Sequence, residues 1–240
     1  MPEAPVPDYP RTQGVRFTAA GLRAGYVRTI PVGLGVSLFG IVFGLVAGQK
    51  GLSVLETGLM SALVFAGASQ MLAMELWTSP VPVLTVAIAA LVINLRYFMM
   101  NAALMPWLQP VGPLRAYGSL FFTADENWAV SVAEMRSGGR DAGFLLGSGL
   151  AIWTFWLTAT LIGRTTGTII ADPERVGVDF VGTAVFTFLL VRMHQGKGDW
   201  LPWTVAGVTA VTAAEFLPGF WYLILGGLAG SIAGALRDVR

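Results

Sequence analysis

The stretch VPVLTVAIAALVINLRYFMM, residues 81–100, decides how the rest of the sequence is understood. It is long and apolar enough to cross a bilayer, yet it carries Asn94 and Arg96 near its end. A charged side chain at the centre of a membrane helix costs about 2.5 to 3.5 kcal/mol on insertion scales. The rest of the sequence must therefore supply a partner for Arg96 or a function that uses its charge.

The composition is that of a membrane protein. Of the 240 residues, 55% are hydrophobic and 12% are charged, against about 25% charged in a typical soluble domain. Repeated apolar stretches of about 20 residues match a hydrocarbon core of about 30 Å, in which helices satisfy their own backbone. We predict an all-α, polytopic transmembrane helical bundle, with residues 21–240 as a single transmembrane domain and residues 1–20 as a disordered cytoplasmic tail.

Seven apolar segments are predicted to cross the bilayer, and an eighth is ambiguous. The seven are Tyr26–Gly48, Thr57–Leu76, Val81–Met100, Gly143–Gly163, Phe180–Met193, Trp200–Phe216 and Phe220–Leu236. The eighth, Tyr117–Met135, has Asp125 and Glu126 in its middle. Whether this segment crosses decides the orientation of every later loop.

The distribution of Lys and Arg favours eight spans, because cytoplasmic loops are enriched in these residues. With the N-terminus inside and Tyr117–Met135 crossing, ten Lys and Arg residues lie inside and four outside, with Arg96 in the membrane. If that segment does not cross, six lie inside and eight outside. We therefore expect about eight spans, with seven as the alternative, and both termini in the cytoplasm.

Glycines at four-residue spacing mark two faces suited to close helix packing. They are Gly40, Gly44 and Gly48 in the first span, and Gly226, Gly230 and Gly234 in the last. Packing within this chain and docking of another subunit both explain such faces.

The run Gly67-Ala68-Ser69-Gln70 interrupts an apolar segment with small and polar side chains. A helix loosened at this point would free backbone groups that can bind a ligand. The alternative is plain helix packing through small residues, with Gln70 bonded to a neighbouring backbone.

Asn94 and Arg96 are candidate carboxylate-binding residues. A guanidinium forks onto a carboxylate, and an amide can donate and accept beside it. Two structural roles compete with this one. Arg96 could form an internal salt bridge with Glu75 or Asp125, or it could extend to the membrane interface.

Asp125 and Glu126 are the candidate proton carriers. A carboxylate withdrawn from water holds a proton more readily, so it can load and release one during transport. The alternative is an ordinary, solvated position at the interface. In that case Arg136 and Arg140 would oppose the charge bias.

Other chemical classes lack a signature. The sequence has no cysteine, and its one histidine, His194, cannot form a histidine cluster. No Walker sequence, nucleophilic triad, metal-ligand constellation or basic nucleic-acid patch is present. We therefore expect neither an enzyme nor a bound cofactor or metal, and no nucleic-acid partner.

These same motifs resemble a known family. Phe65–Gln70, then Asn94–Arg96 one span later, then Thr123–Glu126 are similar to the AzlC-type large subunit of branched-chain amino-acid exporters, and Gly177–Phe180 fits a later span of that family. The resemblance covers about residues 21–236, and the order and spacing of three motifs make it specific. The family usually has His or a similar residue where this chain has Tyr97, which bears on substrate preference rather than on class.

The resemblance implies a multi-pass secondary exporter of leucine, isoleucine and valine, and in some members methionine, in the bacterial inner membrane. It also implies a small, hydrophobic AzlD-type membrane subunit as partner, in a hetero-oligomer or homo-oligomer within the lipid bilayer. Gly67–Gln70, Asn94 and Arg96 would bind the amino acid, and Asp125 and Glu126 would couple transport to the proton-motive force. The alternative function is a passive channel or a secondary transporter for a different small solute.

Overall fold

The computed structural model describes residues 14–167, 196–217 and 221–238, together with residues 187, 191 and 194. In this part of the chain all regular elements are helices, which confirms the all-α class there. The predicted span Phe180–Met193 and most of the predicted tail lie outside the described residues. The main helices are α1 (Ala19–Gln49), α2 (Val54–Val64), α3 (Gly67–Glu75), α4 (Val83–Leu108), α5 (Pro113–Phe121), α6 (Asp125–Arg136), α7 (Gly143–Thr166), α9 (Trp200–Phe216) and α10 (Trp221–Asp238).

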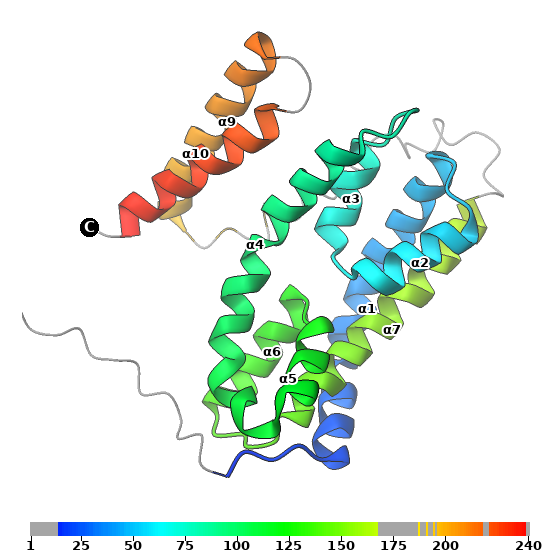
Figure 1. The fold of residues 1–240 in the computed structure, drawn as a ribbon, viewed down its shortest axis with the longest axis vertical. Helices are drawn as coiled ribbons and strands as arrows, with labels where there is room; N and C mark the ends of the chain where they lie inside the picture. Colours follow the sequence, from blue (N-terminus) through cyan, green and yellow to red (C-terminus); the bar gives the residue numbers. More distant parts are fainter. Residues whose placement is uncertain are drawn as a thin grey trace, which may run out of the picture.

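Two long helices, α1 and α7, form the frame of the bundle and run side by side in the same direction (Figure 1). Glycines allow this contact, since a Cβ at Gly44 would collide with the carbonyl oxygen of Thr160 and one at Gly147 with that of Leu22. The packing interpretation of the first glycine face is thus confirmed. The last one likewise packs within the chain, because Gly226 and Gly230 face alanines of α9.

Helix α4 runs in the opposite direction to α1 (Figure 1). Its last turn reaches the N-terminal end of the bundle, defined here as the end that holds residues 14–28 and 137–142, where Trp107 Nε1 donates to the carbonyl oxygen of Gly139 at 3.1 Å. Among the described residues, α1, α7 and residues Val83–Met105 of α4 are long and apolar enough to span a membrane.

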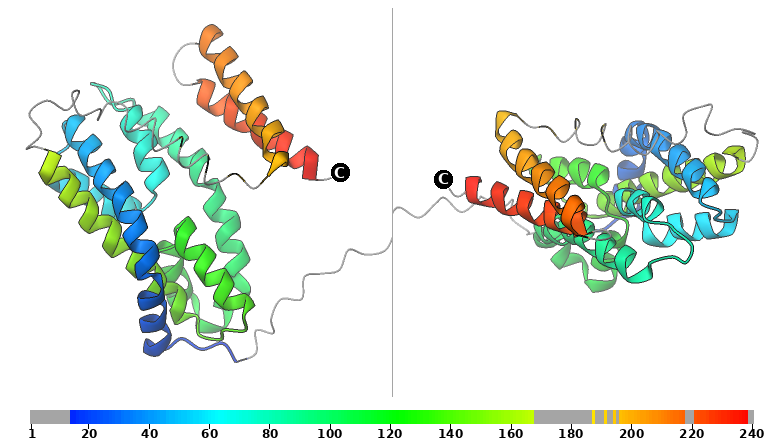
Figure 2. Two further views of the ribbon diagram at one scale, coloured as in Figure 1. Left: turned by 180° about the vertical axis from the view of Figure 1, so that it is seen from behind. Right: turned by 90° about the horizontal axis from the view of Figure 1, so that it is seen from above.

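The segment between α1 and α4 is a helical hairpin in the half of the bundle away from the N-terminal end, called here the upper hairpin (Figures 1 and 2). Ser53 caps the start of α2: its hydroxyl accepts from Glu56 N, while the Glu56 carboxylate accepts from Ser53 N. It ends at Phe65, which has a left-handed backbone with φ of 40°. Helix α3 then returns towards the end from which α2 came, which brings Gln70 back beside Ser61.

The segment between α4 and α7 is a second hairpin, in the half of the bundle nearer the N-terminal end, called here the lower hairpin (Figure 1). Both of its ends lie near α1: the Arg115 guanidinium of α5 stacks on the Phe17 ring, and Glu134 of α6 pairs with Arg28 at 2.5 Å. The chain reverses at residues 122–124, where the Asn127 side chain accepts from Ala124 N and donates to the Phe122 carbonyl.

These hairpins differ from the sequence prediction, in which Thr57–Leu76 and Tyr117–Met135 each cross the bilayer. Their helices have 11 and 9 residues, and 9 and 12 residues. At 1.5 Å per residue each helix is about 14 to 18 Å long, or half of a hydrocarbon core of about 30 Å. Each helix is thus long enough for about half of such a core, and the chain turns back after it; apolar composition alone does not distinguish this path from a crossing.

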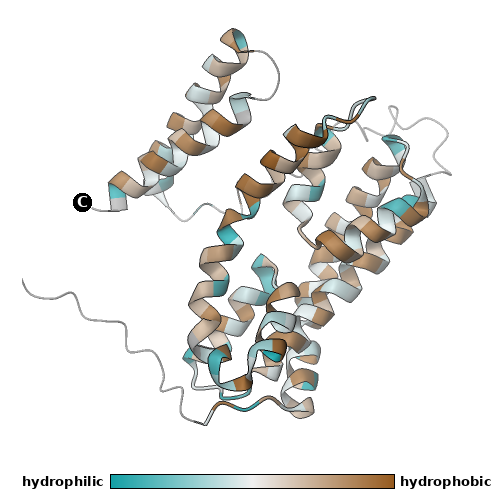
Figure 3. Cartoon of the chain, viewed as in Figure 1, coloured by the Kyte–Doolittle hydropathy of each residue, from teal (hydrophilic) through white to brown (hydrophobic). Residues whose placement is uncertain are grey.

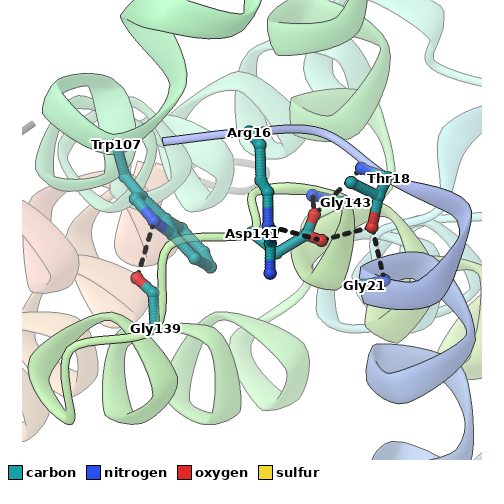
Figure 4. Close-up of polar contacts among 7 residues, drawn as sticks. All are labelled: Arg16, Thr18, Gly21, Trp107, Gly139, Asp141 and Gly143. Atoms are coloured by element: carbon teal, nitrogen blue, oxygen red, sulfur yellow. Dashed lines mark hydrogen bonds and ion pairs between the residues drawn. The ribbon is translucent and has the colours of Figure 1, made fainter. Parts of the chain in front are cut away.

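A polar clasp closes the N-terminal end (Figure 4). The Asp141 carboxylate accepts from the backbone N–H of Thr18 at 3.0 Å, from the Thr18 hydroxyl, and from the backbone N–H of Gly143 at 3.1 Å. Arg16 lies 3.9 Å from the same carboxylate and pairs with the 140–142 backbone. The clasp ties the start of α1 to the loop between α6 and α7.

Helices α9 and α10 form a separate hairpin beside α4 (Figures 1 and 2). Their apolar side chains are largely exposed, as at Val211 (68%) and Ile232 (59%). Large apolar side chains are also exposed on the bundle helices, such as Leu38 (68%) of α1 and Leu55 (70%) of α2, and hydrophobic colour runs along much of these helices (Figure 3). An exposed apolar surface of this extent is the expected exterior of a protein that lies in lipid.

The two hairpins predict which loops are accessible from the same face of the membrane. Because the chain has no cysteine, Lys50→Cys, Thr78→Cys, Leu114→Cys and Ser137→Cys each provide a unique label site. We expect the first two to react with an impermeant maleimide from one face of the membrane, and the last two from the other. Reaction of Lys50→Cys and Thr78→Cys from opposite faces would show that residues 57–76 cross.

Because α1 and α7 are in close contact, we expect the effect of a Gly→Ala substitution in α1 on stability to depend on whether the glycine faces α7. Gly44→Ala should destabilise the bundle by about 1 to 3 kcal/mol, because the new Cβ overlaps the α7 backbone. Gly35→Ala is the control, since nothing lies within 4 Å of a Cβ there. Thermal unfolding in detergent measures both, and equal melting temperatures for the two variants would contradict the packing account.

Candidate functional site

The tips of the two hairpins meet in the middle of the bundle. The rings of Phe65, at the upper tip, and Phe122, at the lower tip, lie 6.4 Å apart between centroids. Trp153 of α7 lies beside them, with its ring 6.1 Å from that of Phe122. Its Nε1 donates to the carbonyl oxygen of Ala62 at 3.1 Å, which satisfies one of the last carbonyls of α2.

Helix α4 passes both tips and contacts each through one polar residue. Ser69, in the first turn of α3, donates from its hydroxyl to Oδ1 of Asn94 at 2.6 Å. Arg96 Nη2 lies 2.9 Å from Oδ2 of Asp125, the first residue of α6. Asn94 and Arg96 are the twelfth and fourteenth of the 26 residues in α4, so these contacts lie halfway along the helix, where hydrophilic colour interrupts α4 in Figure 3.

The ion pair is incompletely enclosed. The side chains of Arg96 and Asp125 are 31% and 43% exposed, and the guanidinium carbon lies 5.1 Å from the ring centroid of Tyr97. Arg96 Nε is nevertheless buried and has no hydrogen-bond acceptor in the described part of the chain. The same holds for the hydroxyl of Thr123 at the lower tip. A buried donor without a partner costs about 1 to 3 kcal/mol, which indicates a place where a ligand or water binds.

The two helix starts at the centre have different electrostatic surroundings. A helix N-terminus carries a partial positive charge and unpaired N–H groups. Helix α6 begins with Asp125 and Glu126, which balance that charge. Helix α3 has no acidic residue in its first turn and no side-chain cap. The centre therefore presents a positive site at α3 and Arg96 beside a negative site at α6.

Gln70 belongs to a buried network behind this centre. Its Nε2 donates to the Ser61 hydroxyl at 3.3 Å, and its Oε1 accepts from Trp156 Nε1 at 3.2 Å. The Ser61 hydroxyl donates to that of Thr160 at 3.2 Å. Gln70 thus holds α2, α3 and α7 together, and Gly67 gives the Trp156 ring the room that it needs.

The structure brings together most of the residues proposed from the sequence. Ser69, Asn94, Arg96 and Asp125 form two direct contacts, and Glu126 follows Asp125 at partial exposure. Of the two salt bridges considered for Arg96, the one with Asp125 is present. We call these residues, with Gly67 and Ala68, the central site. Their role in ligand binding or proton coupling stays a prediction.

Sequence reasoning underestimated several residues. Tyr97 was singled out only as a departure from a family pattern, although its ring lies under the Arg96 guanidinium. Trp153 and Trp156 of α7 each donate a hydrogen bond to the upper hairpin. An indole inside an apolar segment has an N–H that needs a partner, and that requirement was the available signal.

The charges of the central site are complementary to those of a zwitterion. The positive part of the site suits a carboxylate, and its acidic part suits an ammonium or a proton. Among the described residues, no group of three or more His, Cys, Asp or Glu side chains could hold a metal ion. The arrangement therefore resembles the midplane sites that broken helices form in transporters.

Comparison with known proteins places the chain among membrane proteins. The family described as "AzlC protein" matches residues 31–170. An "Uncharacterized membrane protein" of Archaeoglobus fulgidus is 27% identical, over 91% of this chain and 94% of its own length. The "Branched-chain amino acid transport protein AzlC" of Bacillus subtilis is 23% identical, over 86% and 84%. The "Inner membrane protein YgaZ" of Escherichia coli is 22% identical, over 75% and 76%. No solved structure matches the chain.

The ion pair predicts non-additive effects on stability. Arg96→Met or Asp125→Leu alone leaves the other charge uncompensated, at a cost of up to about 3 to 5 kcal/mol, the value for a fully buried pair. The double variant removes both charges and should be more stable than either single variant. Unfolding of all four proteins in detergent gives the coupling energy.

A second ion pair provides the control for this cycle. Arg28 and Glu134 are 2.5 Å apart, but the Arg28 side chain is 63% exposed, so their coupling should stay within about 0 to 1 kcal/mol. A central pair whose single variants add up to the double variant would contradict a structural interaction between Arg96 and Asp125.

Proposed function

Because the chain belongs to the AzlC protein family of membrane transport proteins, we propose that it is the large subunit of a permease that exports branched-chain amino acids, driven by the proton-motive force. The observation that carries this proposal is the pairing of Arg96 with Asp125 halfway along α4, where two hairpin tips meet. A charge kept at this depth is costly, and passage of a charged cargo gives a reason to keep it. The named Bacillus subtilis relative supports the amino-acid class.

The proposed roles follow the charges of the site. Arg96 and Asn94 receive the substrate carboxylate, together with the backbone N–H groups at Gly67–Ser69, where α3 begins without a cap. Asp125 or Glu126 meets the ammonium group or carries the proton. Gln70 holds the upper hairpin in place through Ser61 and Trp156. Apolar surfaces around the two tips receive the branched side chain.

The proposed location is the bacterial inner membrane, with the N-terminal end of the bundle in the cytoplasm. Within residues 14–167, the cations at this end are Arg16, Arg23, Arg28, Arg115, Arg136 and Arg140, whereas Lys50 and Arg164 lie at the other end. This distribution agrees with the enrichment of Lys and Arg on the cytoplasmic side. Because Arg115 also lies at the N-terminal end of the bundle, this bias is stronger than the one predicted for eight spans.

A small membrane subunit of the AzlD type is the proposed partner. Helix α4 carries the central site, yet its apolar side chains Leu84, Leu91 and Phe98 are 74%, 64% and 79% exposed. Either lipid or a second membrane subunit would cover these side chains. We expect the partner to be encoded in the adjacent reading frame.

Export of labelled leucine from loaded cells tests the proposed function. We expect efflux when this chain and its partner are expressed together, and about a hundredfold slower efflux for Arg96→Ala, since the loss of one charged contact to the substrate costs about 2 to 3 kcal/mol. A protonophore should abolish accumulation against a gradient. Efflux at the same rate with and without the protonophore would favour a passive channel. Efflux at the same rate in Arg96→Ala and in the unmodified protein would contradict the proposed site.

A further inference from the structure

We propose that the amino acid opens the Arg96–Asp125 ion pair and inserts its own charges between the two side chains. The substrate carboxylate takes the place of Asp125 on Arg96, and the substrate ammonium takes the place of Arg96 on Asp125. A proton on Asp125 then excludes the ammonium, so proton and amino acid compete for one carboxylate. This inference rests on the proposed function and specifies which ligands the central site accepts and how they are coupled to protons.

The charge balance of the site favours a zwitterion. Arg96 and Asp125 neutralise each other across 2.9 Å, and separating them alone would end this neutralisation halfway along α4. A zwitterion restores a partner to each of them without adding net charge. An organic anion supplies only the partner for Arg96, and an amine supplies only the partner for Asp125.

The guanidinium has unused capacity for a second acceptor. Asp125 contacts Nη2 of Arg96, while Nε is buried and has no acceptor among the described residues. A carboxylate binds a guanidinium through two parallel N–H···O bonds, so a ligand carboxylate on Nη2 and Nε would satisfy a donor that Asp125 leaves unpaired. The side chains of Arg96 and Asp125 are 31% and 43% exposed, so the pair is not sealed off by the described residues.

Proton competition follows from the groups that face Asp125. Helix α4 contributes Arg96 and Tyr97, and α6 itself contributes Glu126. Helix α7 has no charged residue between Gly143 and Gly163. The charged groups of the neighbouring α1 and α5 lie at the N-terminal end: Arg23 and Arg28 of α1, of which Arg28 pairs with Glu134, and Arg115 of α5, which lies over the Phe17 ring. Asp125 and Glu126 are thus the acids that can exchange a proton for an ammonium here, and entry of protons from outside would displace the substrate.

Three ligands of similar shape allow the contributions of the carboxylate and the ammonium group to binding to be measured separately. Leucine carries both, 4-methylpentanoate lacks the ammonium and 3-methylbutylamine lacks the carboxylate. Binding to the full chain with its partner in lipid nanodiscs is measured by calorimetry. We expect leucine to bind at least about a hundredfold more tightly than either analogue, because each analogue supplies a partner for only one of the two charges of the ion pair.

Each variant of the ion pair should remove the preference for leucine over one of the two analogues. Asp125→Asn should bring leucine and 4-methylpentanoate to within about threefold of each other. Arg96→Met should do the same for leucine and 3-methylbutylamine, and Asp125→Glu should partly restore the preference for leucine. Glu134→Gln, in the other ion pair, is the control and should leave all ratios unchanged. A pair that only fixes the fold would weaken all three ligands alike, which would overturn the inference.

The unmodified protein provides a test that does not depend on the folding of any variant. Competition at one site predicts that leucine binding releases up to one proton at a pH where Asp125 is protonated, and that affinity falls about tenfold for each pH unit below its titration. Tight leucine binding without proton release between about pH 4 and 8 would overturn this inference and leave the proposed function standing. Absence of leucine binding at every pH would overturn the proposed function as well.

Discussion

A charged side chain in the middle of a membrane helix is the constraint on which the rest of this structure depends. Arg96 lies halfway along α4 and its charge needs a partner at the same depth. Asp125 can be that partner only because the lower hairpin places the start of α6 there. The ion pair thus explains why the chain between α4 and α7 turns back at residues 122–124.

The upper hairpin meets the same constraint from the opposite side. It places the uncapped start of α3 at the centre, where Ser69 contacts Asn94 just above the ion pair. Trp153 and Trp156 of α7 support this hairpin by satisfying a freed carbonyl and the Gln70 amide. Two hairpins that enter from opposite ends and meet at one helix create a polar centre, while the long helices around them keep continuous backbone hydrogen bonding.

The sequence predicted the helical class and the polar residues of the centre, but it did not predict the hairpins. Apolar runs and charges within them are local signals. Composition was therefore enough to predict the α1, α4 and α7 segments. Position within an apolar run was enough to single out Asn94, Arg96 and Asp125. The path of residues 57–76 depends on a single left-handed residue, Phe65, whose side chain gives no sign of a turn. Two half-length helices and one span have the same hydropathy. Arg96 pairs with Asp125 and not with Glu75 because the turn at residues 122–124 places Asp125 beside it. The charges in the sequence do not distinguish these two partners.

An experimental structure of the complex with its small subunit, determined in saturating leucine, would test the central claim most directly. The account predicts the leucine carboxylate on the Arg96 guanidinium and its ammonium on the Asp125 carboxylate, with the two side chains no longer within the 4 Å of an ion pair. An intact Arg96–Asp125 pair with leucine bound elsewhere would contradict it.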